Sequence, residues 1–346
     1  MSVQEGMPAE RRIPFVLLDA LEVLLMVRNK ADQPEDKQTQ VSGKEETVGS
    51  EPEPTPWPQF IRDNSDDAQI KRRLASEIRG LVGRYGLSQD KYCFLGLYDP
   101  EGEISSWDLD RIFSALRSEN PDKKKNVYLM VVSGGGNIEP AYKISKMCKG
   151  FARDSFIVTV PRHAKSAATL IALGADEIHM GLLGELGPID PQLGKLPALG
   201  VKRAMETIAG LAQQYPGSSE AFARYMAQTV TIARIGYCER VGDSAVQYAE
   251  RLLSKKLKVR PNATKIANEL VYEYKDHSFV IDIEEAREHL GDSWIIIDSA
   301  EIRLAEAVYE VFEHANLLLQ IFRKMRLTVV GSILSENSSW IMPYKR

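Results

Sequence analysis

The sequence predicts an α/β protein built around a parallel sheet with crossover helices. Residues 127–132 form a short, β-branched apolar run that ends in a turn of one serine and three glycines, 133–136. A second run of this kind, Phe156–Val160, ends in another turn and continues into a helical pattern from Ser166. Both segments follow the order strand, turn, helix. Strands that alternate with helices are typical of parallel sheets with crossover connections.

Each element of this sheet unit has its own signal. A helix is expected over 68–85, where apolar residues recur at helical spacing until Gly86 ends it. The strands are short apolar runs bounded by turn residues, and the helices begin just after those turns. The further expected elements are a strand over 92–98, a helix over 106–116, the strand over 127–132, a helix over 138–148, the strand over 156–160, a helix over 166–173 and a strand over 177–180.

The second half of the chain is predicted to be mostly helical. Apolar residues recur there at the spacing of amphipathic helices, and two short β-branched runs flank one of them. The expected elements are helices over 201–211, 221–235, 243–253, 283–290 and 300–323, and short strands over 279–281 and 294–297.

The chain divides into four predicted parts. Residues 1–28 are expected to form an amphipathic helix, because the apolar residues of 13–27 fall on one helical face. This stretch is too short and too charged to span a bilayer. Residues 29–58 form a disordered linker rich in proline and glutamate, since they hold too few aliphatic residues to offset the entropy of ordering. A globular domain is expected over 59–325 and a C-terminal extension over 326–346.

Composition limits the kinds of partner. The chain has 346 residues, 44% hydrophobic and 27% charged, and a net charge of −4, which is ordinary globular usage and gives no support for nucleic acid as a partner. The three cysteines, Cys93, Cys148 and Cys238, form no CxxC pair, so we expect a reducing, cytoplasmic setting. The histidines show no metal-ligand spacing, and we expect neither a metal nor another cofactor.

Two turns of the expected sheet carry groups that suit acyl transfer. The glycines after the strand over 127–132 allow the backbone to approach a ligand closely. Ser166 stands at the start of a helix, where free N–H groups and the helix dipole favour negative charge. A hydroxyl nucleophile and bare N–H donors are two parts that acyl transfer requires, so the pair of turns indicates a serine hydrolase. Taken alone, a serine here is also a common helix cap.

From residue 92 to about residue 297 the sequence resembles the Clp protease/crotonase superfamily. Within it, the chain is most similar to the serine dehydrogenase proteinase family, which is related to signal peptide peptidase A. The resemblance implies a Clp/crotonase-like ββα superhelix with a parallel sheet, a serine protease domain over 59–325, and a peptide or protein as substrate. It rests on four segments that occur in the family's order: 133–138, 161–178, 186–192 and, more weakly, 276–281.

The resemblance also implies the roles of several residues. Ser166 is the nucleophile, and the backbone N–H groups of Gly136 and Ala167 form an oxyanion hole, with Gly135 shaping the turn. Two N–H donors that converge on one oxygen each contribute roughly 3 kcal/mol to lowering the barrier.

The chain departs from the family pattern beside the nucleophile. Relatives usually carry glycines straight after the serine, where this chain has Ala167 and Ala168. Alanine still supplies its N–H, but its methyl group is expected to narrow access. Lys165 precedes the serine, at a position where an apolar residue is typical. Both changes bear on activity.

The general base is left open by the sequence. The histidine of Clp proteases is absent, because 189–191 reads Ile-Asp-Pro here. The serine dehydrogenase proteinase pattern implies a histidine near the end of the domain, which His277 matches, with Asp276 beside it. Histidine acts as a base at neutral pH without a large pKa shift. Signal peptide peptidases use a downstream lysine, for which Lys195 and Lys202 are the candidates, and a lysine needs burial to lower its pKa. We favour His277 over Lys202, with neither as a third alternative.

Three functions are compatible with these residues. The leading one is a cytoplasmic serine endopeptidase that forms a homo-oligomer, with a trimer or a multiple of it expected. The second is a catalytically weak peptide-binding or assembly module, in which the N-terminal helix contacts a partner protein; the missing Clp-type histidine and the two alanines favour it. The third is a crotonase-type acyl-CoA enzyme. Such enzymes use the same oxyanion hole without a serine nucleophile, so Ser166 speaks against this function.

Overall fold

The computed structural model describes residues 55–63, 66–190, 192–193, 196–229, 232–256 and 260–344. The expected N-terminal helix over 1–28 and the linker up to residue 54 lie outside the described residues. Trp57 and Pro58, which the sequence assigned to the linker, begin helix α2 (Trp57–Arg62), because proline is well tolerated in the first turn of a helix. Helix α3 (Asp67–Arg84) follows, capped by the side chain of Asp66.

Within the described residues, the central sheet has nine strands and is mostly parallel, which confirms the predicted fold class. The strands at its centre are buried on both faces, so their sequences are almost continuously apolar. In spatial order the strands are β11 (Ser339–Pro343), β10 (Met325–Ser332), β1 (Tyr92–Asp99), β2 (Asn126–Ser133), β3 (Phe156–Val160), β5 (Glu177–Met180) and β9 (Ile295–Ile296), with β4 (His163–Ala164) and β6 (Glu185–Leu186) paired beside this path.

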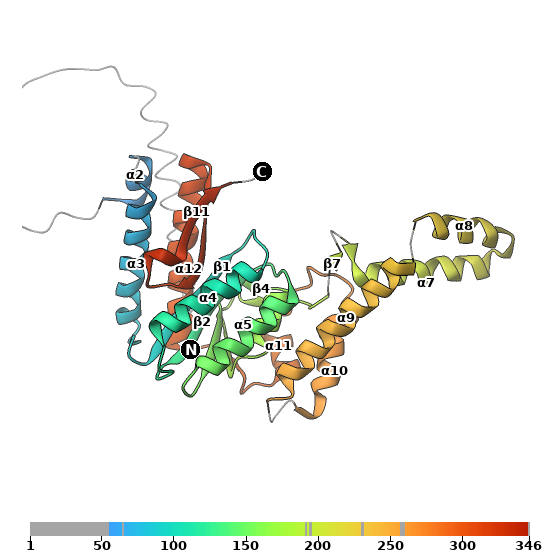
Figure 1. Cartoon of the computed structure of the whole chain (residues 1–346), viewed down its shortest axis with the longest axis horizontal. Helices are drawn as coiled ribbons and strands as arrows, with labels where there is room; N and C mark the ends of the chain where they lie inside the picture. The colour runs from blue at the N-terminus through green and yellow to red at the C-terminus, as the bar shows by residue number, and fades with distance from the viewer. Residues whose placement is uncertain are drawn as a thin grey trace, which may run out of the picture.

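Helices cover both faces of the sheet (Figure 1). Helices α4 (Ser106–Glu119), α5 (Ile138–Phe151) and α6 (Ala167–Ala172) share one apolar core with one face of the strands. Helices α3 and α12 (Ala300–Arg323) build a second core on the other face. In the part of the chain that the structure describes, no helix is long and apolar enough to cross a membrane.

The C-terminal residues differ from the prediction. Residues 326–346 were expected to form an extension, but β10 pairs antiparallel with β1, and β11 pairs with β10. Leu327, Val329 and Val330 of β10 are each 1% exposed, so this short β-branched run belongs to the core. The prediction was wrong because the partner strand lies at the opposite end of the domain in sequence.

Helices α7 (Ala198–Gln214), α8 (Ser219–Thr229) and α9 (Ile232–Leu253) form an arm that projects from the body (Figure 1). Separate helices were expected over 221–235 and 243–253, but α9 continues without interruption through Gly236 and Gly242. A Cβ at Gly242 would lie 2.6 Å from the hydroxyl oxygen of Tyr272, so this glycine serves close packing and does not end the helix.

A small second ladder continues beyond the carboxyl end of the main sheet. Strand β4 pairs with β2 where Ser133 meets Ala164, and with β6 where His163 meets Glu185. Ligand sites in parallel sheets lie beyond the carboxyl ends of the strands. The ladder therefore gathers the glycine turn, the serine turn and the loop after β6 at that edge. Of the two short strands expected near the end of the domain, β9 is confirmed, whereas 279–281 forms a single bridge, from Ile281 to Leu186.

Candidate active site

The turn after β2 has a backbone shape that favours glycine. Gly135 and Gly136 have φ angles of +114° and +144°. A Cβ at Gly135 would lie 2.6 Å from Cβ of Ser166, and a Cβ at Gly136 would lie 2.2 Å from the backbone nitrogen of Ile104. The absence of a side chain at Gly135 therefore lets the glycine turn lie directly against the serine turn, and its absence at Gly136 lets the turn pack on the backbone of Ile104.

Ser166 occupies a strained turn between β4 and α6. Its φ of +54° and ψ of −119° are rare for a residue with a side chain. Although the residue stands at the N-cap position, its hydroxyl forms no capping hydrogen bond in the described structure. The residue is 8% exposed. A sharp strand-to-helix turn with an uncommitted hydroxyl is the geometry of a nucleophile elbow, and it distinguishes Ser166 from an ordinary helix cap.

The N–H groups of Gly136 and Ala167 have no backbone acceptor within the described residues. Ile104 bonds to the glycine turn through the carbonyl of Gly135 and the N–H of Asn137, at 2.8 Å each, which leaves the N–H of Gly136 pointing to the opposite side. Ala167 is the first residue of α6, where helices leave their N–H groups unpaired. The Ala167 nitrogen would lie 3.2 Å from a Cβ at Gly135, so the two turns meet near these donors.

The two alanines that follow the serine are fully buried. Ala167 and Ala168 have 0% exposure and belong to the core shared with α5. Their methyl groups pack in the interior and do not line an open surface, unlike the expectation that they narrow access. The structure therefore gives no sign that alanine obstructs the serine.

The loop after β6 is fixed to the start of α6 by Thr169. The Thr169 hydroxyl oxygen lies 2.7 Å from the carbonyl oxygen of Ala164 and 2.8 Å from that of Gly187, and it accepts the Gly187 N–H at 3.1 Å. The backbone N–H of Ile189 donates to the carbonyl of Leu270 at 2.8 Å. These bonds fix the loop at two points, and they give Asp190, the residue after Ile189, a defined position.

His277 lies in a turn that reaches the same edge of the sheet. Ile281 pairs with Leu186 of β6 through two backbone hydrogen bonds of 2.9 and 3.1 Å. The Nδ1 atom of His277 lies 3.9 Å from Oδ2 of Asp190, which is 5% exposed. Within the described residues, Nδ1 makes no hydrogen bond, and none joins His277 to Ser166. The histidine and aspartate form a loose pair, and the turn that carries the histidine is joined to the serine turn by Lys165, whose ammonium group donates to the Ser278 carbonyl at 3.0 Å.

Electrostatics favour a neutral imidazole at this position. Burial lowers the pKa of His277 below its ordinary value, the negative charge of Asp276 opposes this, and the positive charge of Lys165 lowers it further. A lowered pKa keeps the ring neutral at pH 7, as a general base requires. The Asp276 carboxylate accepts the Ser278 N–H at 2.7 Å, so it closes the turn that carries the histidine.

The carboxylate next to His277 was missed from the sequence. Residues 189–191 were noted only because they lack the Clp-type histidine, whereas the structure places Asp190 beside the imidazole. An isoleucine followed by an aspartate in the loop after β6 was the available signal. Of the lysines considered as bases, Lys195 lies outside the described residues. Lys202 belongs to α7, but its side chain is not among those described.

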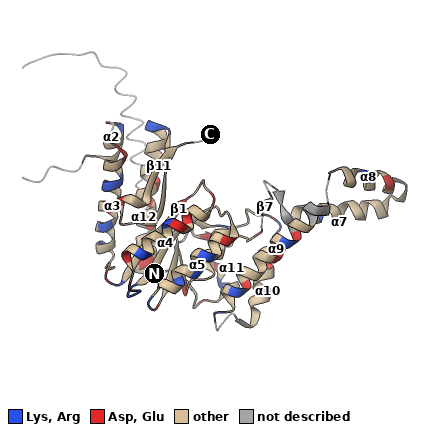
Figure 2. Ribbon diagram, in the orientation of Figure 1, with Lys and Arg blue, Asp and Glu red and all other residues tan. Residues whose placement is uncertain are grey.

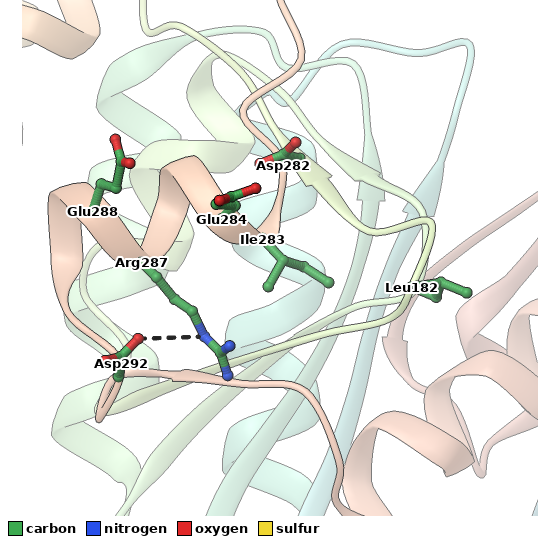
Figure 3. A pocket seen from close by; sticks show the side chains of 7 residues that line it. All are labelled: Leu182, Asp282, Ile283, Glu284, Arg287, Glu288 and Asp292. Carbon is green, nitrogen blue, oxygen red and sulfur yellow. Dashed lines mark ion pairs between the residues drawn. The ribbon is translucent and has the colours of Figure 1, made fainter.

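A hollow of about 740 Å³ opens near these loops (Figure 3). Leu182, after β5, faces it from one side, and helix α11 (Ile283–Leu290) faces it from the other. The Nε atom of the half-buried Arg287 lies 3.7 Å from Oδ1 of the exposed Asp292, in an ion pair beside the hollow. Neither Ser166 nor His277 lines this hollow, so it neighbours the candidate site and is distinct from it. Its lining residues are Leu182, Asp282, Ile283, Glu284, Arg287, Glu288 and Asp292.

The turns at this edge bring together a serine hydroxyl, an imidazole with a carboxylate nearby, and two N–H groups without a backbone acceptor in the described residues, which are the kinds of group that serine hydrolases use. The sequence model of one protein family, described as ClpP-like SDH-type serine proteinase, matches residues 69–317. The match spans most of the chain, and the chain belongs to this family, as its motifs predict.

Two curated proteins of Methanocaldococcus jannaschii are similar to part of the chain. Uncharacterized protein MJ0137 is 38% identical over 103 residues, which are 30% of this chain and 35% of that protein. Uncharacterized protein MJ1495 is 29% identical over 136 residues, which are 39% of this chain and 44% of that protein. The chain thus covers less than half the length of these relatives.

Solved protease structures share a distant likeness. One is a mutant of the 1510-N membrane-bound stomatin-specific protease in complex with a substrate peptide, with 16% identity, a TM-score of 0.41, and coverage of 75% of this chain and 90% of that chain. Another is ClpP1 from Listeria monocytogenes, with 15% identity, a TM-score of 0.37, and coverage of 61% and 94%.

Proposed function

We propose that this protein is a serine endopeptidase that cleaves peptide bonds through an acyl-enzyme on Ser166. His277 accepts the hydroxyl proton as the serine oxygen attacks the scissile carbonyl, while Asp190 orients the imidazole and stabilises its charged form. The N–H groups of Gly136 and Ala167 bind the carbonyl oxygen as it becomes negative. The proton passes from the imidazolium to the leaving amine, and a water molecule then hydrolyses the ester with His277 again as base.

The backbone of Ser166 carries this proposal. A non-glycine residue at a φ of +54° costs roughly 1–3 kcal/mol, and such strain concentrates at functional sites. A serine that only capped the helix would need no such backbone and would use its hydroxyl on the helix N–H groups. The family to which the chain belongs supports the same class of activity.

A fluorophosphonate probe, which reacts with activated serines, tests the proposal. We expect labelling of the wild type and none of Ser166→Ala, with both proteins folded. Ser299→Ala is a matched control, because Ser299 also stands at the N-cap of a helix and its hydroxyl lies 2.7 Å from a histidine nitrogen. Equal labelling of wild type and Ser166→Ala would remove this serine from the site.

A peptide-binding module without turnover is the second candidate. The observation that favours it is the missing hydrogen bond between Ser166 and His277 in the described structure. Catalytic hydrogen bonds are often long without substrate and tighten in the complex, so this geometry does not outweigh the strained serine. Such a module would bind peptides without cleaving them and would leave the probe unreacted. A crotonase-type acyl-CoA enzyme needs the oxyanion hole but no nucleophile, so the strained serine counts against it.

We propose in addition that the protein self-associates through the arm of α7, α8 and α9, in a trimer or a multiple of it. Among the described residues between 203 and 228, none is buried, and the large apolar or aromatic side chains of Leu211, Tyr215 and Tyr225 are 37%, 54% and 59% exposed. Figure 2 shows few charged residues toward the far end of the arm. Isolated helices gain most of their stability from packing an apolar face, so this surface suits a second copy of the chain.

Light scattering tests the proposed assembly. The wild type should have a mass above that of the monomer at tens of micromolar. Leu211→Glu should reduce that mass, because it places a charge on the exposed apolar arm, whereas Gln213→Glu, also exposed on α7, should not. A monomeric wild type would contradict the proposal.

The remaining parts of the chain complete the proposal. The segment over 1–28, which the sequence predicts to be an amphipathic helix, binds a partner protein, and removing everything before Trp57 should then leave the oligomer mass unchanged. A reducing cytoplasm is the proposed compartment. Cys93 and Cys148 are buried free thiols, and burial raises the pKa of Cys93 to about 12 and that of Cys148 above its ordinary value. Such protonated thiols are unreactive.

A further inference from the structure

We propose that Lys165, the residue before the nucleophile, is a positioning residue that holds the turn carrying His277 against the serine turn and places a positive charge near the imidazole. This inference rests on the proposed function, because it assigns a role to Lys165 only if His277 is the base for Ser166.

The ammonium group of Lys165 joins three segments of the site. Its Nζ lies 2.9 Å from Oε1 of Glu185 on β6, and it donates to the backbone carbonyl of Ser278 at 3.0 Å. Ser278 directly follows His277. The side chains of Lys165 and Glu185 are 18% and 24% exposed, so water screens this pair less than an open surface pair. The lysine thus links the serine turn, β6 and the histidine turn.

The backbone of Lys165 is held by hydrogen bonds on both sides, so its side chain starts from a fixed position. Its backbone N–H donates to the Ser133 carbonyl at 3.0 Å, and its carbonyl accepts the Ala168 N–H at 2.9 Å. The aliphatic stem passes over Gly187, where a Cβ would lie 3.0 Å from Cγ of the lysine. Gly187 therefore leaves room for the stem, and the ammonium group reaches the histidine turn from a fixed origin.

The charges around His277 come from each segment packed against it. Asp190 follows β6, Asp276 belongs to the same turn as the histidine, and Lys165 comes from the serine turn; Glu185 pairs with the lysine and offsets part of its charge. A positive charge disfavours a second one, so Lys165 opposes protonation of the imidazole and lowers its pKa. Removing this charge raises the pKa, and the base then becomes neutral only at higher pH.

An ordinary structural ion pair is the competing explanation, and the chain contains a matched example. The Nζ of Lys256 lies 3.2 Å from Oδ1 of Asp176 and 3.5 Å from the carbonyl oxygen of Gly174, and its side chain is 16% exposed. It resembles Lys165 in burial and in joining a carboxylate to a carbonyl, but it follows α9 and binds residues between the carboxyl end of α6 and β5, whereas Ser166 stands at the opposite end of α6. Lys256→Met therefore measures what the loss of such a pair does to the fold alone.

The test is the pH dependence of the rate at which a fluorophosphonate labels Ser166. In Lys165→Met, which keeps the length of the stem, we expect a limiting rate lower by about 10- to 100-fold, because the histidine turn loosens. We also expect a shift of the acid limb, the part of the profile where the labelling rate falls as the pH is lowered, to a pH higher by about half to one unit. Lys165→Arg should return the limb to its wild-type position and recover part of the rate. Lys256→Met should change neither, although it lowers the melting temperature.

The outcomes separate the inference from the proposed function. If Lys165→Met is folded and its acid limb lies at the same pH as that of the wild type, the role of Lys165 is overturned. The proposed roles of Ser166 and His277 are unaffected by that result. A wild type that the probe does not label overturns the proposed function itself. If Lys165→Met does not fold, Glu185→Gln replaces it, because it frees the lysine without removing its charge. That variant should label more slowly with no upward shift of the limb, and an upward shift contradicts the proposal.

Discussion

Two helices of this chain begin at a serine with a histidine nearby, and they differ in what the serine does. At α12, the Ser299 hydroxyl accepts the Ile302 N–H at 3.1 Å and lies 2.7 Å from Nδ1 of His179. At α6, the Ser166 hydroxyl neither caps the helix nor contacts a histidine in the described structure. The serine with the better histidine contact is the one that is committed to the fold.

The surroundings explain the difference. His179 is 3% exposed, and its other ring nitrogen lies 2.9 Å from Oε2 of Glu177, so the ring is a satisfied structural group. Ser299 has an extended backbone, with φ −148° and ψ 164°, and stores no strain. Ser166 has a strained backbone and lies against a glycine turn with a free N–H group. A serine–histidine contact is thus a poor guide to a nucleophile; an unused hydroxyl beside free N–H donors is a better one.

The largest effect should come from removing the two serines in turn. Ser166→Ala should lower peptide hydrolysis by roughly a million-fold, since loss of a serine nucleophile abolishes the covalent route. Ser299→Ala should keep the activity but lower the free energy of unfolding by about 1 kcal/mol, because α12 loses its cap. Turnover of a fluorogenic peptide and urea unfolding measure the two quantities. If Ser299→Ala is the inactive variant, the comparison is reversed.

Removing the histidines should have the next largest effect. His277→Ala should cost several orders of magnitude in kcat, whereas His179→Ala should act through stability, because its ring contacts the structural partners Ser299, Glu177 and Glu301. The wild-type profile should lose activity as the pH falls through a pKa below the ordinary 6.5, since burial disfavours the imidazolium. Near-normal turnover of His277→Ala, with an inactive Lys202→Ala, would instead establish a serine–lysine pair.

The smallest of the three effects should come from the glycine turn. In Gly135→Ala the new methyl group would lie 2.6 Å from Cβ of Ser166, so one of the two turns must shift, and we expect a loss of roughly 100-fold in kcat. Gly134→Ala is the matched control, because a Cβ there meets no atom within 4 Å. Equal losses in both variants, measured with the same peptide, would mean that the spacing of the turns does not matter.

The sequence predicted those parts of the molecule that depend on local pattern. Strands β2 and β3, the turns after them and the helix from Ala300 follow directly from apolar periodicity and turn residues. What it missed depends on distant pairings. Asp190 approaches His277 only because Ile281 pairs with Leu186, and nothing in either segment alone reports that bridge.

Two further differences have the same cause. The strand β10 was taken for an extension because its partner β1 is far away in sequence. Lys165 was noted as unusual, but its links to Glu185 and Ser278 depend on the position of both segments in space. Local pattern pointed to the proposed nucleophile and to the glycine turn, and tertiary structure was required to find the groups that lie around the proposed base.

The central claim is that Ser166, and not the better-bonded Ser299, is the nucleophile. Mass spectrometry of peptides from the fluorophosphonate-treated wild-type protein tests it directly, because it locates the adduct on a residue. The account predicts a single adduct on the peptide that contains Ser166, which disappears when His277 is replaced by alanine. An adduct on Ser299, or on another serine with Ser166 unmodified, would contradict it.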